Sequence, residues 1–234
     1  MSVSANLLRR FAAGLLCGAW LGLPTLAAAQ ISTVECGSLV NAYGPYDYRV
    51  YKDSIEIQRV DQHHFTPLVE GLIKPIARHF GGDMDYTLRA SPNHHRALIT
   101  MARWSERLKN PTPPDASYTV DCYFDRAMRF AQDDLVVRMI YAGHLGRTGR
   151  KADALAQLDH VAAKADNAFT HYNAGLAYFD LQEFDKALKQ AHAAARLGMP
   201  RTELRERLKA QGKWVELPAA PSPGVAANTA PPKP

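Results

Sequence analysis

Two pairs of adjacent histidines are the side chains of this chain best suited to bind a metal ion or a small anion. The pairs are His63-His64 and His94-His95, and Arg89 lies between them in the sequence. Imidazole nitrogens are common ligands of zinc and copper, and a guanidinium recognises anions. Adjacent residues of a helix point about 100° apart, so neither pair can chelate a metal as an i, i+4 pair would. A metal site therefore requires one histidine from each pair, together with an aspartate.

A structural role for the histidines is the favoured interpretation. His94 and His95 follow Pro92-Asn93, a plausible helix start, so both are expected in a first turn. Hydrogen bonds to Tyr86 or to backbone carbonyls would then fix the N-terminal segment against the rest of the fold. We therefore expect no cofactor and no metal. A metal or small-anion site built from the two pairs remains the alternative.

Catalytic motifs are absent from the sequence. It contains no nucleophile elbow, no metalloprotease His-Glu pattern, no glycine-rich phosphate loop and no C-x-x-C. We expect a protein without enzymatic activity. An enzyme that uses both histidine pairs, with Arg89 as an anion site, is the alternative.

The strongest structural pattern lies in residues 168–200, which read as two antiparallel helices joined by a tight turn. Small residues fall where the helix axes must approach closely, at Gly175 and Ala187. With an aromatic at Tyr178 and a further small residue at Ala194, the segment resembles a tetratricopeptide repeat (TPR). The resemblance implies a solenoid of helical hairpins that binds other polypeptides, and it does not name the partner.

Residues 135–167 repeat this pattern at a constant offset, which is one position shorter than the family's usual repeat of about 34 residues. The aligned pairs are Ala142 with Gly175, Leu145 with Tyr178, Gly149 with Gln182, Ala154 with Ala187 and Val161 with Ala194. A first repeat would pair a helix opening at Asn93 with one from Tyr118 to Phe130. The segment 85–98 also resembles exported TPR-like proteins of proteobacteria, a group that adds no functional expectation.

The resemblance places a peptide-binding groove on the first helix of each hairpin. The residues expected to line it are Met139, Ile140, Arg147, Phe169, Tyr172, Asn173, Leu176, Phe179 and Asp180, with Val136 and Gly143 beside them. Most of them are apolar or aromatic, which suits a hydrophobic segment of another protein. The alternative is that Tyr43 or Tyr46 of the N-terminal segment fills the groove.

The remaining segments complete an all-α, TPR-like α-solenoid of two to three hairpins. Residues 30–85 are expected to be irregular, with a short helix capped by Thr66 and ended by Gly81-Gly82. The repeat domain should span 86–214 and close with a capping helix from Thr202 to Trp214. Residues 215–234 are rich in proline and alanine and are expected to be disordered.

The N-terminus has the pattern of an export signal over residues 1–29. Arg9 and Arg10 precede the apolar run from Phe11 to Leu26, and small residues end at Ala29. The run is short for a bilayer span of about 20 residues, so a retained anchor is only the alternative. We expect a periplasmic protein that binds a polypeptide of the cell envelope. Removing both arginines lowers the net charge from +5 to +3, which argues against a nucleic-acid partner.

Two cysteines remain after the signal, Cys36 and Cys122. In an oxidising compartment, two cysteines with no other cysteine in the mature chain usually form a disulfide. This crosslink would close a long loop and stabilise the fold by about 4 kcal/mol at most. Two buried free thiols are the alternative.

Overall fold

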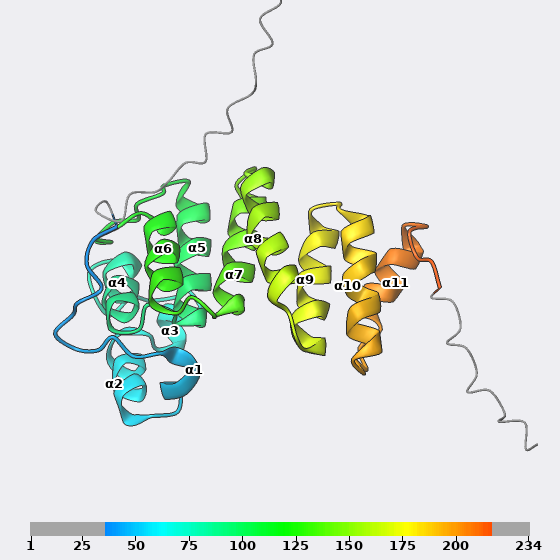
Figure 1. The fold of residues 1–234 in the computed structure, drawn as a ribbon. Helices are drawn as coiled ribbons and strands as arrows, with labels where there is room; N and C mark the ends of the chain where they lie inside the picture. Colours follow the sequence, from blue (N-terminus) through cyan, green and yellow to red (C-terminus); the bar gives the residue numbers. More distant parts are fainter. Residues whose placement is uncertain (1–35, 217–234) are drawn as a thin grey trace, which may run out of the picture. The chain divides into compact units, whose positions relative to one another are not determined.

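The computed structural model describes residues 36–216, and the regular elements in this range are all helices (Figure 1). They are α1 Tyr48–Tyr51, α2 Ile55–His64, α3 Pro67–Glu70, α4 Phe80–Ala90, α5 His95–Leu108, α6 Val120–Phe130, α7 Leu135–Arg147, α8 Lys151–Lys164, α9 Ala168–Asp180, α10 Phe184–Arg196 and α11 Glu203–Ala210. The all-α prediction is confirmed. Within residues 36–216, every helix is too short or too polar to cross a bilayer. The predicted signal peptide and most of the predicted disordered tail lie outside these residues.

The hairpins α7–α8 and α9–α10 repeat each other at a constant offset. Helices α7 and α9 have the same length, 13 residues, and the step from Leu135 to Ala168 equals the step from Lys151 to Phe184. The aligned small and apolar positions of both hairpins are buried. Gly149 and Gln182 take the same place in the two turns, and both have positive φ, +81° and +62°. The repetition therefore extends from the helix bounds to the backbone conformation of the turn.

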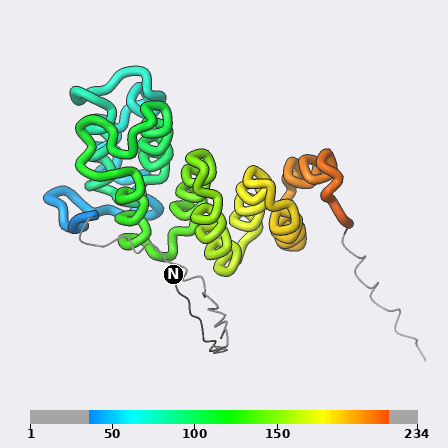
Figure 2. Tube along the Cα trace, turned by 90° about the horizontal axis from the view of Figure 1, so that it is seen from above, coloured from blue at the N-terminus to red at the C-terminus, as the bar shows by residue number. Residues whose placement is uncertain are grey.

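We call α5, α7 and α9 the first helices and α6, α8 and α10 the second helices. Each first helix packs against the next, in the pairs α5 with α7 and α7 with α9. Helix α11 packs against both α9 and α10, at the end of the series of hairpins (Figures 1 and 2). The second helices are separated by two open basins. The first basin, of about 970 Å³, lies between α6 and α8, and the second, of about 490 Å³, lies between α8 and α10.

Helix α11 covers the last hairpin, and it is shorter than the helix predicted from Thr202 to Trp214 because it ends at Ala210. Leu204 and Leu208 are buried among residues of α9 and α10. A Cβ placed on Gly175 would lie 2.5 Å from the Leu204 side chain and 3.2 Å from the Gln190 side chain. The small residue at position 175 is therefore needed for the close approach of α9 to its neighbours.

The N-terminal part is more helical than the sequence indicated. The predicted cap of α3 is confirmed, since the Thr66 hydroxyl accepts a hydrogen bond from the Val69 N–H and Pro67 begins the helix. The prediction of an otherwise irregular segment is wrong, because α1, α2 and the start of α4 lie within residues 30–85. Helix α3 ends at Glu70 and buries Val69, whereas Ile73 and Ile76 lie beyond its end and are exposed.

Gly81 and Gly82 lie in the first turn of α4 and do not end a helix. A Cβ on Gly81 would lie 2.1 Å from the Pro114 carbonyl oxygen. The glycine therefore lets the loop between α5 and α6 approach the backbone of α4. Buried Asp83 fixes the preceding loop, since its carboxylate accepts hydrogen bonds from the N–H groups of Ile76 and Ala77 at 2.8 and 3.0 Å.

The predicted disulfide between Cys36 and Cys122 is present, and the two cysteines are 86 positions apart in sequence. Two arginines of α6 reinforce the crosslink. Buried Arg126 donates hydrogen bonds to the carbonyls of Cys36 and Ser38 at 3.0 and 2.6 Å, and Arg129 donates to the Gly37 carbonyl at 3.1 Å. The beginning of the described chain is thus fastened to α6.

A second fastening joins the N-terminal segment to the hairpins through Asn93. Its side-chain oxygen accepts a hydrogen bond from the Tyr48 N–H at 2.9 Å, and its amide donates to Asp134 at 2.9 Å. Asp134 also caps α7, because its carboxylate accepts hydrogen bonds from the Val136 and Val137 N–H groups. Helices α1, α5 and α7 therefore share one buried polar network.

Candidate functional site

The side of α7 and α9 that is not packed into the core forms one continuous stripe on each helix. We call these two stripes the first-helix face. Its residues are Val136, Met139, Ile140, Gly143 and Arg147 of α7 with Phe169, Asn173, Leu176 and Asp180 of α9. Since α7 and α9 are packed together and repeat each other at a constant offset, equivalent positions of the two stripes are neighbours.

The middle of the first-helix face is apolar. Met139, Ile140 and Leu176 are half-buried against the core, and Phe169 is 55% exposed. A Cβ on Gly143 would have only the Arg147 side chain within 4 Å, so no other helix of the described chain covers α7 there. Apolar side chains that are partly open to water, on a helix with no covering element, fit the binding of an apolar segment.

Ion pairs occupy the C-terminal end of each of the two stripes. The Arg147 guanidinium binds Glu106 of α5, with its Nε 2.9 Å from Oε2. Arg207 of α11 donates to the Asp180 carboxylate at 2.5 Å and lies over the ring of Phe179, 4.3 Å from its centre. Arg147, Asp180 and Phe179 are therefore already engaged within the molecule.

Tyr172 does not lie on the first-helix face, contrary to the expectation from the sequence. Its side chain is 2% exposed and lines a small cavity with Ala194, Leu204 and Trp214. The capping helix takes the space on that side of α9, so the ring belongs to the core. Asn173 does lie on the face, but its side-chain amide donates to the Phe169 carbonyl at 2.8 Å.

The tyrosines of the N-terminal segment do not fill the first-helix face. The Tyr43 hydroxyl donates to the Glu56 carbonyl at 3.3 Å, and the Tyr46 N–H donates to the Ala90 carbonyl at 2.9 Å. The two rings contact each other, 5.4 Å apart. These contacts hold both side chains on α2 and α4, away from α7 and α9.

His94 has a structural role at the start of α5, but its side-chain partners are not the predicted Tyr86 or backbone carbonyls. It is the buried N-cap of α5, and its Nδ1 accepts a hydrogen bond from the Ala97 N–H at 3.2 Å. Nε2 therefore carries the proton and donates to Asp61 at 3.1 Å. The ring also lies 4.1 Å from that of Tyr48. Burial lowers the pKa of His94, against the opposing effect of Asp61.

The other three histidines are held apart. Nε2 of His95 lies 2.7 Å from Asp134, whereas the ring of His64 stacks on that of Tyr86 at 3.8 Å. His63 is exposed. The two pairs therefore do not converge, and no group of three potential metal ligands occurs among residues 36–216.

Arg89 does not join the histidines in an anion site either. Its Nε donates to Asp85 at 2.9 Å, and its Nη1 donates to the Asn41 side chain at 3.3 Å. The guanidinium is thus already paired with a carboxylate.

Comparison with family models, with curated proteins and with solved structures gives no match.

Proposed function

We propose that this chain is an exported, TPR-like solenoid that acts as a scaffold or adaptor and binds a polypeptide of the cell envelope. The repetition of two hairpins at a constant offset supports the solenoid. So does the packing, in which first helices contact one another while open basins separate the second helices. A stack built this way curves toward its first helices, as in TPR proteins.

The observation that carries the proposal is the apolar first-helix face. Phe169 is 55% exposed, and Met139, Ile140 and Leu176 are partly open. The N-terminal tyrosines leave this face free, because their contacts hold them on α2 and α4. We infer that the ligand is an extended apolar segment laid across α7 and α9.

A site-directed photo-crosslinking experiment tests this assignment. A benzophenone amino acid is placed at Phe169 or at Ile140, with Ala156 on the exposed side of α8 as the matched control. In cells that export the protein, we expect discrete adducts from the two first-helix positions and none from position 156. Adducts of equal yield at all three positions, or at Ala156 alone, would contradict the proposal.

A charge placed on the face supplies a second test. Phe169→Asp should abolish the adduct formed from position 140, because a carboxylate is costly to bury against an apolar ligand. Thermal unfolding of this variant should match that of the parent chain, since Phe169 is outside the core. Tyr172→Ala is unsuitable for this purpose, because Tyr172 is buried and its removal would weaken the fold.

Export is tested separately from binding. Cell fractionation should find the protein in the periplasm, and mass spectrometry should find its N-terminus at Gln30. A cytosolic protein that keeps Met1 would refute the export part of the proposal and leave the first-helix face untouched.

A further inference from the structure

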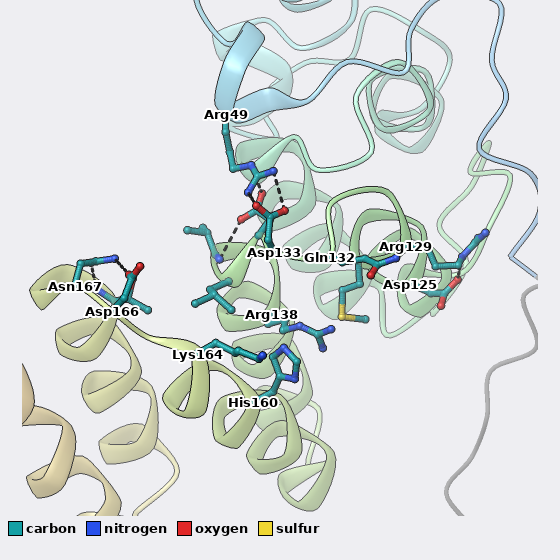
Figure 3. A pocket seen from close by; sticks show the side chains of 15 residues that line it. Arg49, Asp125, Arg129, Gln132, Asp133, Arg138, His160, Lys164, Asp166 and Asn167 are labelled. Atoms are coloured by element: carbon teal, nitrogen blue, oxygen red, sulfur yellow. Dashed lines mark hydrogen bonds and ion pairs between the residues drawn. The ribbon is translucent and has the colours of Figure 1, made fainter.

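The basin between α6 and α8 contains a group of basic side chains that the proposed function does not use (Figure 3). Arg138 of α7 with His160 and Lys164 of α8 point toward the same part of this basin (Figure 3). The basin is open to solvent on the second-helix side, so a ligand in solution can reach it.

Within the described chain, these basic groups lack carboxylate partners. Arg138 donates from Nη1 to the Gln157 side chain at 2.8 Å, and its Nε is buried without any hydrogen-bond partner among residues 36–216. Over the same residues, neither Arg138 nor Lys164 forms an ion pair with an acidic side chain. A buried donor without a partner is costly, and an arriving acceptor would remove that cost.

Three of the four acidic side chains of the basin are paired with basic groups, and the fourth, Asp166, is not. Asp125 accepts from Arg129 at 2.7 Å, and Asp133 lies 3.0 Å from Arg49. Asp134 belongs to the network of His95 and Asn93, and Asp166 accepts from the neighbouring Asn167 at 2.9 Å. Because the Asn167 amide is neutral, Asp166 keeps its negative charge. Among residues 36–216, the charged groups of the basin without an oppositely charged partner are Arg138 and Lys164, against this one carboxylate.

We propose that Arg138, His160 and Lys164 form a binding site for an oxyanion, either a phosphate or a carboxylate group. The planar guanidinium can contact two oxygens of such a group, and Lys164 adds a flexible point charge. His160 would donate a further hydrogen bond from a ring N–H. This site is separate from the first-helix face. A negative phosphate titration would therefore contradict the oxyanion site alone, and a negative crosslinking result would contradict the peptide-binding role alone.

The repeat architecture itself does not require these residues. At the equivalent positions of the next hairpin, Arg138 corresponds to His171, His160 to Ala193 and Lys164 to Leu197. The polar contact to the second helix is kept, since His171 lies 2.6 Å from Gln190, the equivalent of Gln157. These three positions are therefore not repeated in the next hairpin, although the second basin has basic side chains of its own at Lys186, Lys189 and Arg196.

The electrostatics of His160 give the site a built-in reporter. Burial lowers the pKa of His160, and the charges of Arg138 and Lys164 lower it further. A bound anion offsets these two charges and should raise the pKa of His160. Of the nearest acidic groups of the basin, Asp125 and Asp133 are engaged as described, and Asp166 is not among the groups that shift the pKa of His160.

The test is a titration of the full-length protein with sodium phosphate at constant ionic strength, followed by NMR of the histidine ring protons. We expect a saturable shift of His160 and none of His171 in the second basin. Arg138→Gln and Lys164→Gln should each weaken the apparent phosphate affinity about tenfold or more. Lys189→Gln removes one charge beside the second basin and should leave the titration unchanged.

Two outcomes would overturn the site. One is a linear, non-saturating response of His160 to phosphate. The other is a loss of phosphate affinity in Lys189→Gln as large as that in Lys164→Gln. Lys164 is exposed, so its variant folds even if Arg138→Gln does not. A parallel titration with succinate distinguishes the sources, because tighter phosphate binding indicates a phosphorylated ligand and tighter succinate binding a carboxylate ligand.

Discussion

His94 is a buried imidazole whose protonation opposes folding. Its pKa in the folded protein is lowered by burial and by the charge of Arg96, although Asp61 acts in the opposite direction. The unfolded chain binds a proton near the ordinary histidine pKa of about 6.5, whereas the folded chain does not. The contribution of His94 to stability is therefore present above about pH 6.5 and is lost as the pH falls toward the lower pKa of the folded state.

His94→Asn removes this titration and keeps an acceptor that can cap α5. We expect the variant to be less stable overall, because the contacts with Tyr48 and Asp61 are lost. Between about pH 7.5 and about pH 5.5, however, its free energy of unfolding should fall less than that of the parent chain. Urea unfolding at both pH values measures the difference. His63→Asn, at an exposed position, should keep the pH dependence of the parent, and an equal change in the two variants would contradict this account.

At the residue level, the sequence predicted the partners of a disulfide and the cap of α3, but not the side of α9 on which Tyr172 lies. Helix α9 is apolar on most of its circumference, so periodicity alone does not separate the core side from the open side. The proposed oxyanion site could not be predicted from the sequence either. His160 and Lys164 are four residues apart on α8, but nothing in the sequence links them to Arg138, which only the packing of α7 against α8 brings beside them.

Among the helices, α7 and α9 each contain a glycine in a different environment, and the two glycines can test how the hairpins pack. A Cβ on Gly143 would meet only the flexible Arg147 side chain, whereas one on Gly175 would lie 2.5 Å from Leu204. Gly143→Ala should therefore raise the free energy of unfolding by about 0.5–1 kcal/mol, the usual gain for alanine within a helix. Gly175→Ala should lower it by about 1 kcal/mol, because the contact must be relieved by a shift of α11.

Chemical denaturation of both glycine variants measures these changes. Adding Leu204→Ala to Gly175→Ala should recover part of the loss caused by the new methyl group, which a double-mutant cycle isolates. A stabilisation of similar size at both glycines would mean that α9 is not held closely by its neighbours.

The repeated helices were predictable because the sequence could be compared with itself at a fixed offset. Helices α2 and α4 offered no such comparison. Helix α2 buries only Ile57 and Val60 of its ten residues, so its apolar pattern is weak. Helix α4 begins at Phe80 with two glycines that normally mark a break. Gly81 allows a loop that is distant in the sequence to approach α4 at Pro114, and no local sequence pattern indicates this contact.

For the molecule as a whole, α11 covers the last hairpin on the side of α9 that faces away from α7. Burial of a leucine side chain contributes about 1.5–3 kcal/mol, and α11 supplies two such residues, Leu204 and Leu208. A chain that ends at Pro200 exposes Tyr172 and the apolar side of the last hairpin. We expect it to unfold at a lower temperature than the full chain and to self-associate in light scattering.

A chain that ends at Glu216 is the matched control for this truncation, since it keeps α11 and Trp214. It should unfold at the same temperature as the full chain and remain monodisperse wherever the full chain does. Identical melting of the chains ending at positions 200 and 216 would show that α11 is not a cap.

Under the proposed export, the crosslink from Cys36 to Cys122 would set an order of events for a chain that crosses the membrane from its N-terminus. The first cysteine arrives well before its partner, and the partner arrives before any residue of α7. Oxidation can thus complete the loop while the hairpins are still on the other side of the membrane. The N-terminal segment would then be fastened to α6 before α7 and α9 reach the same compartment.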